Sequence, residues 1–287
     1  MKKKFFSVMV ILLSIFIGLY YDEIESTYSS SVAEGILEVY FLDVGQADSI
    51  LIRNNEEVML IDAGNNEDGA LLSSYISSLG IDTFKYVVGT HPHEDHIGGL
   101  DNIINDFNIE TIFLPDVITT TKTFTEVLDA IEAKSMSYEV PKIGDKYSLG
   151  TADIEVIYTG TDESDLNNTS IVLRLDFGST SLLFTGDATD KTEELILNKN
   201  IDVDVLKVGH HGSRYSSTLE FLEKVSPEYA IISVENPNSY GHPHSETLEK
   251  FQNANIEVHR TDEEGTILLS TDGEKIEISN IRTDVNG

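Results

Sequence analysis

Polar side chains of this chain gather at the ends of apolar runs, and this placement constrains the fold more than any other feature. Seven of the eight histidines fall in "THPHEDH" (90–96), "VGHH" (208–211) and "YGHPH" (240–244). Asp62 in "LIDAG" and Asp187 in "LLFTGDA" follow apolar runs in the same way. Functional sites of sheet proteins collect where strands end and loops begin. The pattern therefore predicts a sheet-based fold with a polar site along one edge.

Strand-like runs alternate with amphipathic helical segments through most of the chain. We expect strands at 36–44, 48–54, 57–64, 84–90, 109–115, 152–160, 169–178, 180–188, 203–213, 228–234 and 256–261, and a hairpin at 265–279. We expect helices at 67–80, 97–107, 123–134, 189–200, 217–225 and 245–255. Because helices are interspersed among the strands, we predict an α/β layered domain with the sheets inside and the helices outside.

The composition excludes several classes of function. The net charge is −31, with 50 acidic residues against 19 basic ones, which argues against a protein that wraps nucleic acid electrostatically. The chain has no cysteine, so it has no disulfide framework, thiolate zinc site or thiol nucleophile. Carboxylates and imidazoles remain available, and these are ligands for divalent cations.

The N-terminus has the pattern of an export segment. Three lysines precede an apolar run in "MKKKFFSVMVILLSIFIGLYY" (1–21), which predicts a signal peptide or an uncleaved membrane anchor. The lysines would stay inside and the rest of the chain would lie outside, secreted or held at the cell surface. Residues 22–34 are expected to form a polar linker, 35–280 the folded domain and 281–287 a tail.

The cluster from His91 to His96 has the spacing of a metal site. His91 and His93 lie two apart on an extended segment, so both side chains can point the same way. Asp95 and His96 follow where the chain turns into a helix, so one pair can hold one cation and the next pair a second. Imidazole and carboxylate ligands suit zinc, manganese or iron. The alternative is a polar helix N-terminus with incidental histidines.

Two later segments can complete such a site. Asp187 ends an apolar strand, where a carboxylate is costly unless it is paired, bound to metal or caps a helix. His210 and His211 offer one further ligand, and strand alternation does not decide between them. Asp62 is expected to orient a ligand imidazole from behind.

The segment "YGHPH" does not fit the predicted ligand set. We interpret His242 as a substrate contact or as the acid that protonates the leaving group, because the strand before it should end near the site. The alternative is a turn shaped by Gly241 and Pro243, with His244 directly before a helix cap.

The chain resembles the metallo-β-lactamase superfamily, and within it the metallohydrolase domain of the competence protein family ComEC/Rec2. The resemblance covers residues 36–280 and is carried, in order, by "FLDVGQADSILIR", "LIDAG", "THPHEDHIGGL", "NNTSIVLRL", "LLFTGDA", "LKVGHHGS" and "YGHPHSETLEKF". It implies a four-layer αβ/βα sandwich with a two-metal site at one edge of the sheets.

The resemblance also implies a role for each candidate ligand. His91 and His93 would hold the first metal, and Asp187 would bridge both. The ligands implied for the second metal are Asp95, His96 and one of His210 and His211. The resemblance therefore predicts two divalent ions as cofactors, zinc being the first choice and manganese or iron the alternatives.

Two departures from the superfamily pattern matter. The third histidine of the first metal is replaced in "DLNNTS" by Asn167 or Asn168, of which we place Asn168 behind the ligands. This replacement is similar to the ComEC branch and argues against activity as a β-lactamase. ComEC carries its metallohydrolase domain beside a polytopic membrane channel, whereas this sequence has one apolar segment, so we expect no DNA channel.

These observations predict an exported di-metal hydrolase that uses a metal-bridging hydroxide oriented by Asp95. Its predicted substrate is a phosphodiester, either DNA, which would make it a nuclease, or a cell-envelope polymer. The first alternative is hydrolysis of a carboxylic ester, lactone or thioester. The second is a binding module stabilised by metal that catalyses nothing. The membrane is a predicted partner if the N-terminal segment is retained, and no feature predicts a protein partner.

Overall fold

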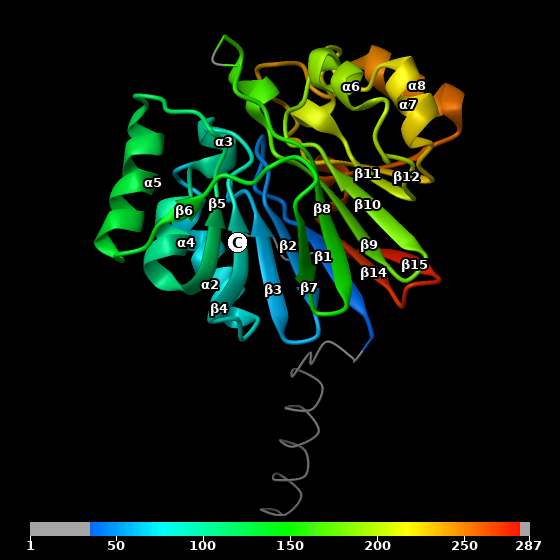
Figure 1. Cartoon of the computed structure of the whole chain (residues 1–287). Coiled ribbons are helices and arrows are strands. Elements are labelled where there is room, and N and C mark those ends of the chain that lie inside the picture. Colours follow the sequence, from blue (N-terminus) through cyan, green and yellow to red (C-terminus); the bar gives the residue numbers. More distant parts are fainter. Residues whose placement is uncertain (1–34, 163, 282–287) are drawn as a thin grey trace, which may run out of the picture.

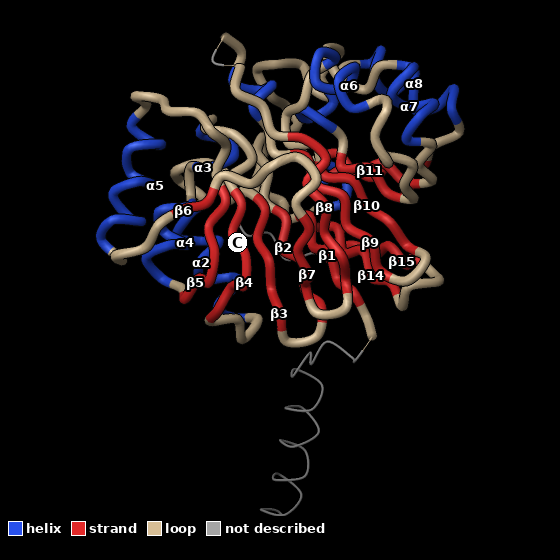
Figure 2. Tube along the Cα trace, viewed as in Figure 1, coloured by secondary structure: helices blue, strands red, loops and turns tan. Residues whose placement is uncertain are grey.

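Two β-sheets pack face to face, and helices cover the outer face of each sheet (Figure 1). The computed structural model describes residues 35–162 and 164–281. In Figure 2 the strands form the centre of the molecule and the helices lie at its periphery. The predicted α/β layered domain is therefore confirmed, in the αβ/βα order of a four-layer sandwich.

The first sheet has eight strands in the order β15-β14-β1-β2-β3-β4-β5-β6. Its antiparallel part, from β15 to β3, is followed by parallel pairing of β3 with β4 and β4 with β5. The strands are β1 (Leu37–Phe41), β2 (Ile50–Asn54), β3 (Glu57–Ile61), β4 (Thr83–Val88), β5 (Asn108–Phe113), β6 (Tyr138–Glu139), β14 (Thr266–Thr271) and β15 (Ile276–Ile281).

The second sheet has seven strands in the order β13-β12-β11-β10-β9-β8-β7, of which β10 to β13 are parallel. Its strands are β7 (Lys146–Leu149), β8 (Ala152–Tyr158), β9 (Val172–Phe177), β10 (Thr180–Phe184), β11 (Val205–Lys207), β12 (Tyr229–Ile232) and β13 (Glu257–Arg260). Each sheet thus contains a parallel part whose carboxyl ends can share one edge.

The six predicted helices are all present. Helices α2, α4 and α5 cover the first sheet, and α6, α7 and α8 cover the second (Figure 1). The helices are α2 (Gly69–Ser78), α3 (Glu94–Ile97), α4 (Leu100–Asp106), α5 (Lys122–Ala133), α6 (Asp190–Ile196), α7 (Leu219–Val225), α8 (Ser245–Ala254) and α9 (Thr261–Glu264), with 3₁₀ turns η1 (Leu166–Thr169) and η2 (Gly209–Gly212). Short elements such as β6, α3 and α9 were not predicted, because too few residues carry a periodic pattern.

Strand alternation divides the buried apolar residues into layers. In β2, for example, Leu51 faces the helices of the first sheet, whereas Ile50 and Ile52 face the second sheet. In β10, Leu182 and Phe184 face the first sheet and Leu183 faces α6 to α8. Both faces of the central strands are therefore buried. Polar side chains are left to gather at the strand ends.

The predicted export segment, the linker and all but one residue of the tail lie outside the described residues. Among residues 35–162 and 164–281, no helix is both long and apolar enough to cross a membrane.

Candidate metal centre

The carboxyl ends of four strands from both sheets meet at one edge of the sandwich. Asp62 follows β3, His91 to His96 follow β4, Asp187 follows β10, and His210 and His211 follow β11. The donor atoms of the segments after β4, β10 and β11 form two groups within which every pair lies within 4.8 Å. The first group is His91, His93 and Asp187, and the second is Asp95, His96, Asp187 and His211.

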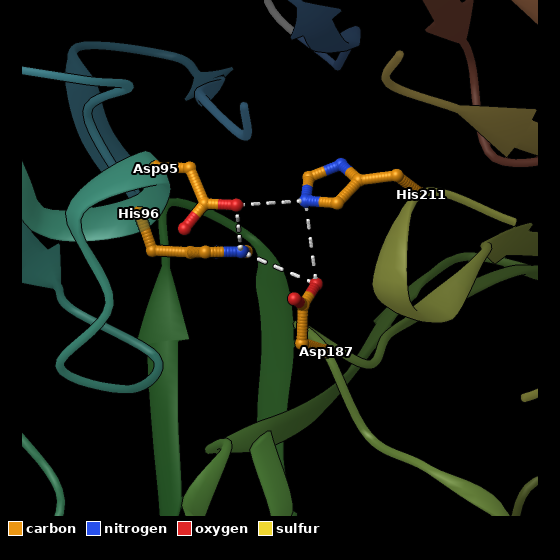
Figure 3. A group of neighbouring side chains, drawn as sticks. All are labelled: Asp95, His96, Asp187 and His211. Atoms are coloured by element: carbon orange, nitrogen blue, oxygen red, sulfur yellow. Dashed lines mark ion pairs between the residues drawn. The ribbon is translucent and has the colours of Figure 1, made fainter. Parts of the chain in front are cut away.

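The second group takes two donors from each sheet, and all four side chains point at one another (Figure 3). The Nε2 atom of His96 lies 3.2 Å from Oδ1 of Asp187 and 4.0 Å from Oδ2 of Asp95. The Nε2 atom of His211 lies 3.6 Å from the same Asp187 oxygen and 3.3 Å from Asp95 Oδ2. Two imidazoles and two carboxylates thus converge on one point.

The first group uses the other oxygen of Asp187. Nε2 of His91 lies 3.8 Å from Asp187 Oδ2 and 3.0 Å from Nδ1 of His93. Asp187 therefore presents one carboxylate oxygen to each group. This is the arrangement that a carboxylate shared by two cations requires.

Hydrogen bonds behind the donors orient three of the imidazoles. Nδ1–H of His96 donates to Oδ2 of Asp62 at 2.7 Å, and Nδ1–H of His211 donates to the carbonyl of Ser233 at 2.9 Å. The Thr90 hydroxyl donates to Asp62 at 2.7 Å, so its oxygen can accept from Nδ1 of His91 at 3.2 Å. These bonds hold the Nδ1 side of each ring and direct Nε2 of all three imidazoles toward the centre, as in metal-ligating histidines.

The inward side chains are buried, and three of their donor atoms have no hydrogen-bond partner. His91 and His96 are 0% exposed, His211 1% and Asp187 2%. Nε2 of His96, Nε2 of His211 and Oδ1 of Asp187 are unpaired. A buried polar atom without a partner costs free energy of folding. A divalent cation binds both imidazole nitrogens and carboxylate oxygens, so it would give these atoms a partner. The donor set therefore fits divalent metal ions.

The charges within the cluster are strongly coupled. Burial would lower the pKa of His96, but Asp187, Asp62 and Asp95 outweigh it and hold the pKa well above the usual range. Burial would raise the pKa of Asp187, but the neighbouring His96 and His211 hold it well below the usual range. Carboxylates that stabilise neighbouring protonated imidazoles this strongly would also stabilise a bound metal cation.

The two imidazoles of the first group, His91 and His93, have lowered pKa values and are neutral at neutral pH. Burial and then the neighbouring His96 lower the pKa of His91 well below its usual value. Burial also lowers the pKa of His93. Neutral imidazole is the form that binds metal, so these two side chains need lose no proton to do so.

The turn η2 separates the roles of His210 and His211. Both residues have left-handed backbone conformations, with φ of 52° and 51°. Such values are uncommon outside glycine and often mark functional sites. They turn His211 into the second donor group, whereas His210 is partly exposed and lies 3.8 Å from Asp187 Oδ2. The strand predicted to run to residue 213 ends at Lys207.

The two asparagines of "DLNNTS" face different ways. Asn167 lines the cavity above the donors. Asn168 is buried, and its Oδ1 accepts from the hydroxyls of Thr189 and Thr192 at 2.6 and 3.1 Å. Asn168 therefore supports the start of α6 after Asp187, and among the described residues its side chain makes no hydrogen bond to a candidate ligand.

His242 lies on the wall of the same cavity, and its Nδ1 has no hydrogen-bond partner. Its ring centroid is 5.4 Å from that of His210 and 6.4 Å from that of His211. Burial, followed by the nearby His210, His211 and His244, lowers the pKa of His242 to about 4. A neutral imidazole favours the predicted substrate contact over the predicted leaving-group acid.

His244 has a structural position. It directly precedes helix α8, and its Nδ1 accepts from the backbone N–H of Arg214 at 3.2 Å. Of the two histidines in "YGHPH", His242 is therefore the one that lines the cavity.

A buried ion pair behind the centre was not predicted. Nζ of Lys207 donates to Oδ2 of Asp48 at 2.7 Å, and their side chains are 0% and 1% exposed. Asp48 also donates its backbone N–H to the carbonyl of Asp95, and its Oδ1 lies 3.6 Å from Nδ1 of His211. The sequence signal for this pair was a charged residue within or beside an apolar run, namely Asp48 in "QADSILI" and Lys207 in "DVLKVG".

This pair also explains a third group of neighbouring donors, Asp48, Asp62 and His96. Lys207 neutralises Asp48, and Asp62 accepts from both Thr90 and His96. We therefore interpret these residues as support for the ligands. Ser170 was not predicted either: its hydroxyl accepts from the backbone N–H of Asp187 at 3.1 Å.

Comparisons with known proteins place the chain in one protein family and one fold. A family model described as the metallo-beta-lactamase superfamily matches residues 42–234. ComE operon protein 3 of Bacillus subtilis (strain 168) is 31% identical over 80% of this chain and 32% of its own length. Recombination protein 2 of Haemophilus influenzae is 28% identical over 86% of this chain and 30% of its own. The chain thus spans about a third of the length of these curated relatives.

Solved structures share the fold at low identity. The metallo-beta-lactamase fold protein YhfI from Bacillus subtilis superposes with a TM-score of 0.53 at 13% identity, over 82% of this chain and 99% of that chain. CmlA, a diiron beta-hydroxylase from Streptomyces venezuelae, gives 0.53 at 14% identity, over 78% and 52%. These likenesses concern the fold alone.

Proposed function

Because the chain belongs to the metallo-beta-lactamase superfamily, whose members are typically metal-dependent hydrolases, we propose that it hydrolyses phosphodiesters with two divalent metal ions. The observation that carries this proposal is the sharing of Asp187 by two adjacent donor groups on the floor of a cavity of about 830 Å³. Paired cations suit a reaction in which oxygens on both sides of a phosphorus atom need stabilisation. We propose zinc for both ions, with manganese or iron as alternatives.

The proposed ligands are those that the structure brings together. His91 and His93 would hold one ion, Asp95, His96 and His211 would hold the other, and Asp187 would serve both. When bound, the ions would lower the pKa of water and polarise a phosphoryl oxygen.

The surrounding residues would position this chemistry. Asp62 keeps the proton of His96 on Nδ1, which directs Nε2 inward. The side chain of Asp95 is 29% exposed on the cavity side, and we propose that it orients the attacking water. His242 would contact the substrate from the cavity wall.

A panel of substrates tests the proposal. The metal-loaded full chain should hydrolyse bis(p-nitrophenyl) phosphate faster than a lactone or a carboxylic ester, and chelation should abolish the activity. Metal content is measured in the same sample. Hydrolysis of the lactone without the phosphodiester would reject the proposed substrate class, and a fully loaded protein that hydrolyses nothing would favour a binding module.

His242→Ala should lower phosphodiesterase activity while metal content stays full. Loss of one neutral hydrogen bond to the substrate corresponds to roughly tenfold in kcat/KM. We expect a similar loss for aryl and alkyl leaving groups, because the imidazole is neutral in the free protein. Rates and metal content are measured together, with His259→Ala as the control outside the cavity. A larger loss for alkyl leaving groups would make His242 the leaving-group acid, and a loss of metal would make it a ligand.

We also propose that the folded domain lies outside the cytoplasm. The support is the sequence of residues 1–21, in which lysines precede an apolar run. A C-terminal reporter that is active only in the cytoplasm should therefore be silent. A reporter that requires export should be active, and the opposite pair of results would reverse the proposed orientation.

A further inference from the structure

The cavity above the metal centre has a negatively charged mouth. Its floor is formed by the donors around Asp187, and its outer wall comes from the loops after β1, β3 and β12 and from the start of α3. Among the described residues that line it there is no lysine or arginine. The acids on the outer wall are Glu67, Asp68, Glu94 and Glu235.

The acids of the mouth act on one another. Burial raises the pKa of Asp68, and the charges of Glu67 and Glu235 raise it further. Glu235 comes from the loop after β12, whereas Glu67 and Asp68 come from the loop after β3. The rim therefore concentrates negative charge from several segments on one opening.

One loop presents an acid, an aromatic ring and an imidazole to this cavity. Asn238 organises the loop: its Nδ2 donates to the carbonyls of Glu235 and His242 at 2.6 and 2.5 Å. Its Oδ1 accepts from the backbone N–H groups of Tyr240 and His242 at 3.0 and 3.1 Å. Glu235, Tyr240 and His242 all line the cavity.

Tyr240 is an exposed aromatic residue with one face supported. Its ring is stacked on that of His242 at 5.6 Å with an interplanar angle of 23°, and the residue is 65% exposed. An aromatic face in a cavity lined by carboxylates attracts an organic cation, because the ring quadrupole and the acids act in the same direction. His242 lines the same wall, and its buried Nδ1 has no hydrogen-bond partner.

We propose that the phosphodiester substrate carries an ammonium group on the arm that reaches the mouth, so that Tyr240 and Glu235 bind the ammonium while the centre binds the phosphate. This inference rests on the proposed phosphodiesterase function. The cavity would be cationic at its metal-loaded floor and anionic at its mouth, which complements a zwitterion. A polynucleotide strand carries a negative charge about every 3.4 Å and would set further phosphates against the acids.

A pair of isosteric substrates isolates the charge. p-Nitrophenyl phosphocholine and 3,3-dimethylbutyl p-nitrophenyl phosphate share a leaving group and differ in a quaternary nitrogen replaced by carbon. We expect the metal-loaded full chain to prefer the choline ester in kcat/KM by about tenfold or more. The preference should shrink as ionic strength rises, because the acids of the mouth are exposed.

Variants of the mouth should change this ratio. Tyr240→Leu and Glu235→Gln should each bring the ratio toward one, and Tyr240→Phe should keep most of it because the ring remains. Glu220→Gln, on the exposed face of α7 and outside the cavity, is the matched control and should leave the ratio unchanged. A second readout needs no turnover: calorimetry should show tighter binding of phosphocholine than of 3,3-dimethylbutyl phosphate.

The outcomes distinguish failure of the ammonium site from failure of the proposed phosphodiesterase function. Hydrolysis of both esters at equal kcat/KM would overturn the ammonium site and leave the phosphodiesterase intact. Preferential cleavage of an oligonucleotide over the choline ester would also overturn it. Hydrolysis of neither ester by fully loaded protein would reject the phosphodiesterase itself.

Discussion

Asp187→Ala should remove metal from both donor groups and lower the hydrolytic rate by about 10³-fold or more. Each carboxylate oxygen of Asp187 faces a different group, so the substitution takes a ligand from both. Metal ions contribute several kcal/mol to such reactions, and each 1.36 kcal/mol is a factor of ten in rate. Metal per chain, measured by elemental analysis after gel filtration, should fall from about two ions to one or none.

Asp190→Ala is the matched control for this variant. Asp190 is an exposed acid three residues further along, at the start of α6. Its replacement should leave both metal content and rate unchanged. Full metal content in the Asp187 variant would show that this carboxylate is not shared, and two ions would then need other ligands.

Lys207→Met should lower the free energy of unfolding by about 3–5 kcal/mol. The substitution removes the cation and leaves the Asp48 carboxylate buried without its partner. Breaking one side of a buried ion pair costs more than the pair itself is worth, because the remaining charge is far from water. Chemical denaturation of metal-free protein measures the loss without a contribution from metal binding.

Two further variants show that the pairing is the cause. Lys122→Met removes the cation of an exposed pair with Glu126, whose side chains are 83% and 37% exposed, and should change stability by less than about 1 kcal/mol. The double variant Lys207→Met with Asp48→Leu should recover much of the lost stability, because neither charge remains. A double variant as unstable as Lys207→Met would mean that the lysine acts through packing instead.

The fold and most of the candidate donors could be predicted because their signals are local. Alternating or continuous apolar runs mark the strands, and the acids and histidines that follow them mark one edge. The support of His96 by Asp62 was also predictable, since an acid ending a buried strand needs a partner.

The remainder depends on contacts and backbone angles that the sequence does not encode locally. The placement of His211, and not of His210, in the second donor group follows from two consecutive left-handed residues, which strand alternation cannot anticipate. Asp48 and Lys207 are 159 residues apart and meet only when the sheets pack together. The different orientations of Asn167 and Asn168 depend in the same way on the packing of α6.

The division of the donors between the two sheets has a consequence for when the protein acquires its ions. Neither donor group is complete within residues 91–96, since both need Asp187 and one also needs His211. A chain emerging from the ribosome, or threading unfolded through a secretion channel, therefore carries no finished coordination set. We expect metal to bind in the compartment where the segments of Asp187 and His211 fold against residues 91–96. The metal ions available in that compartment, together with the ligands, then determine which metal the protein binds.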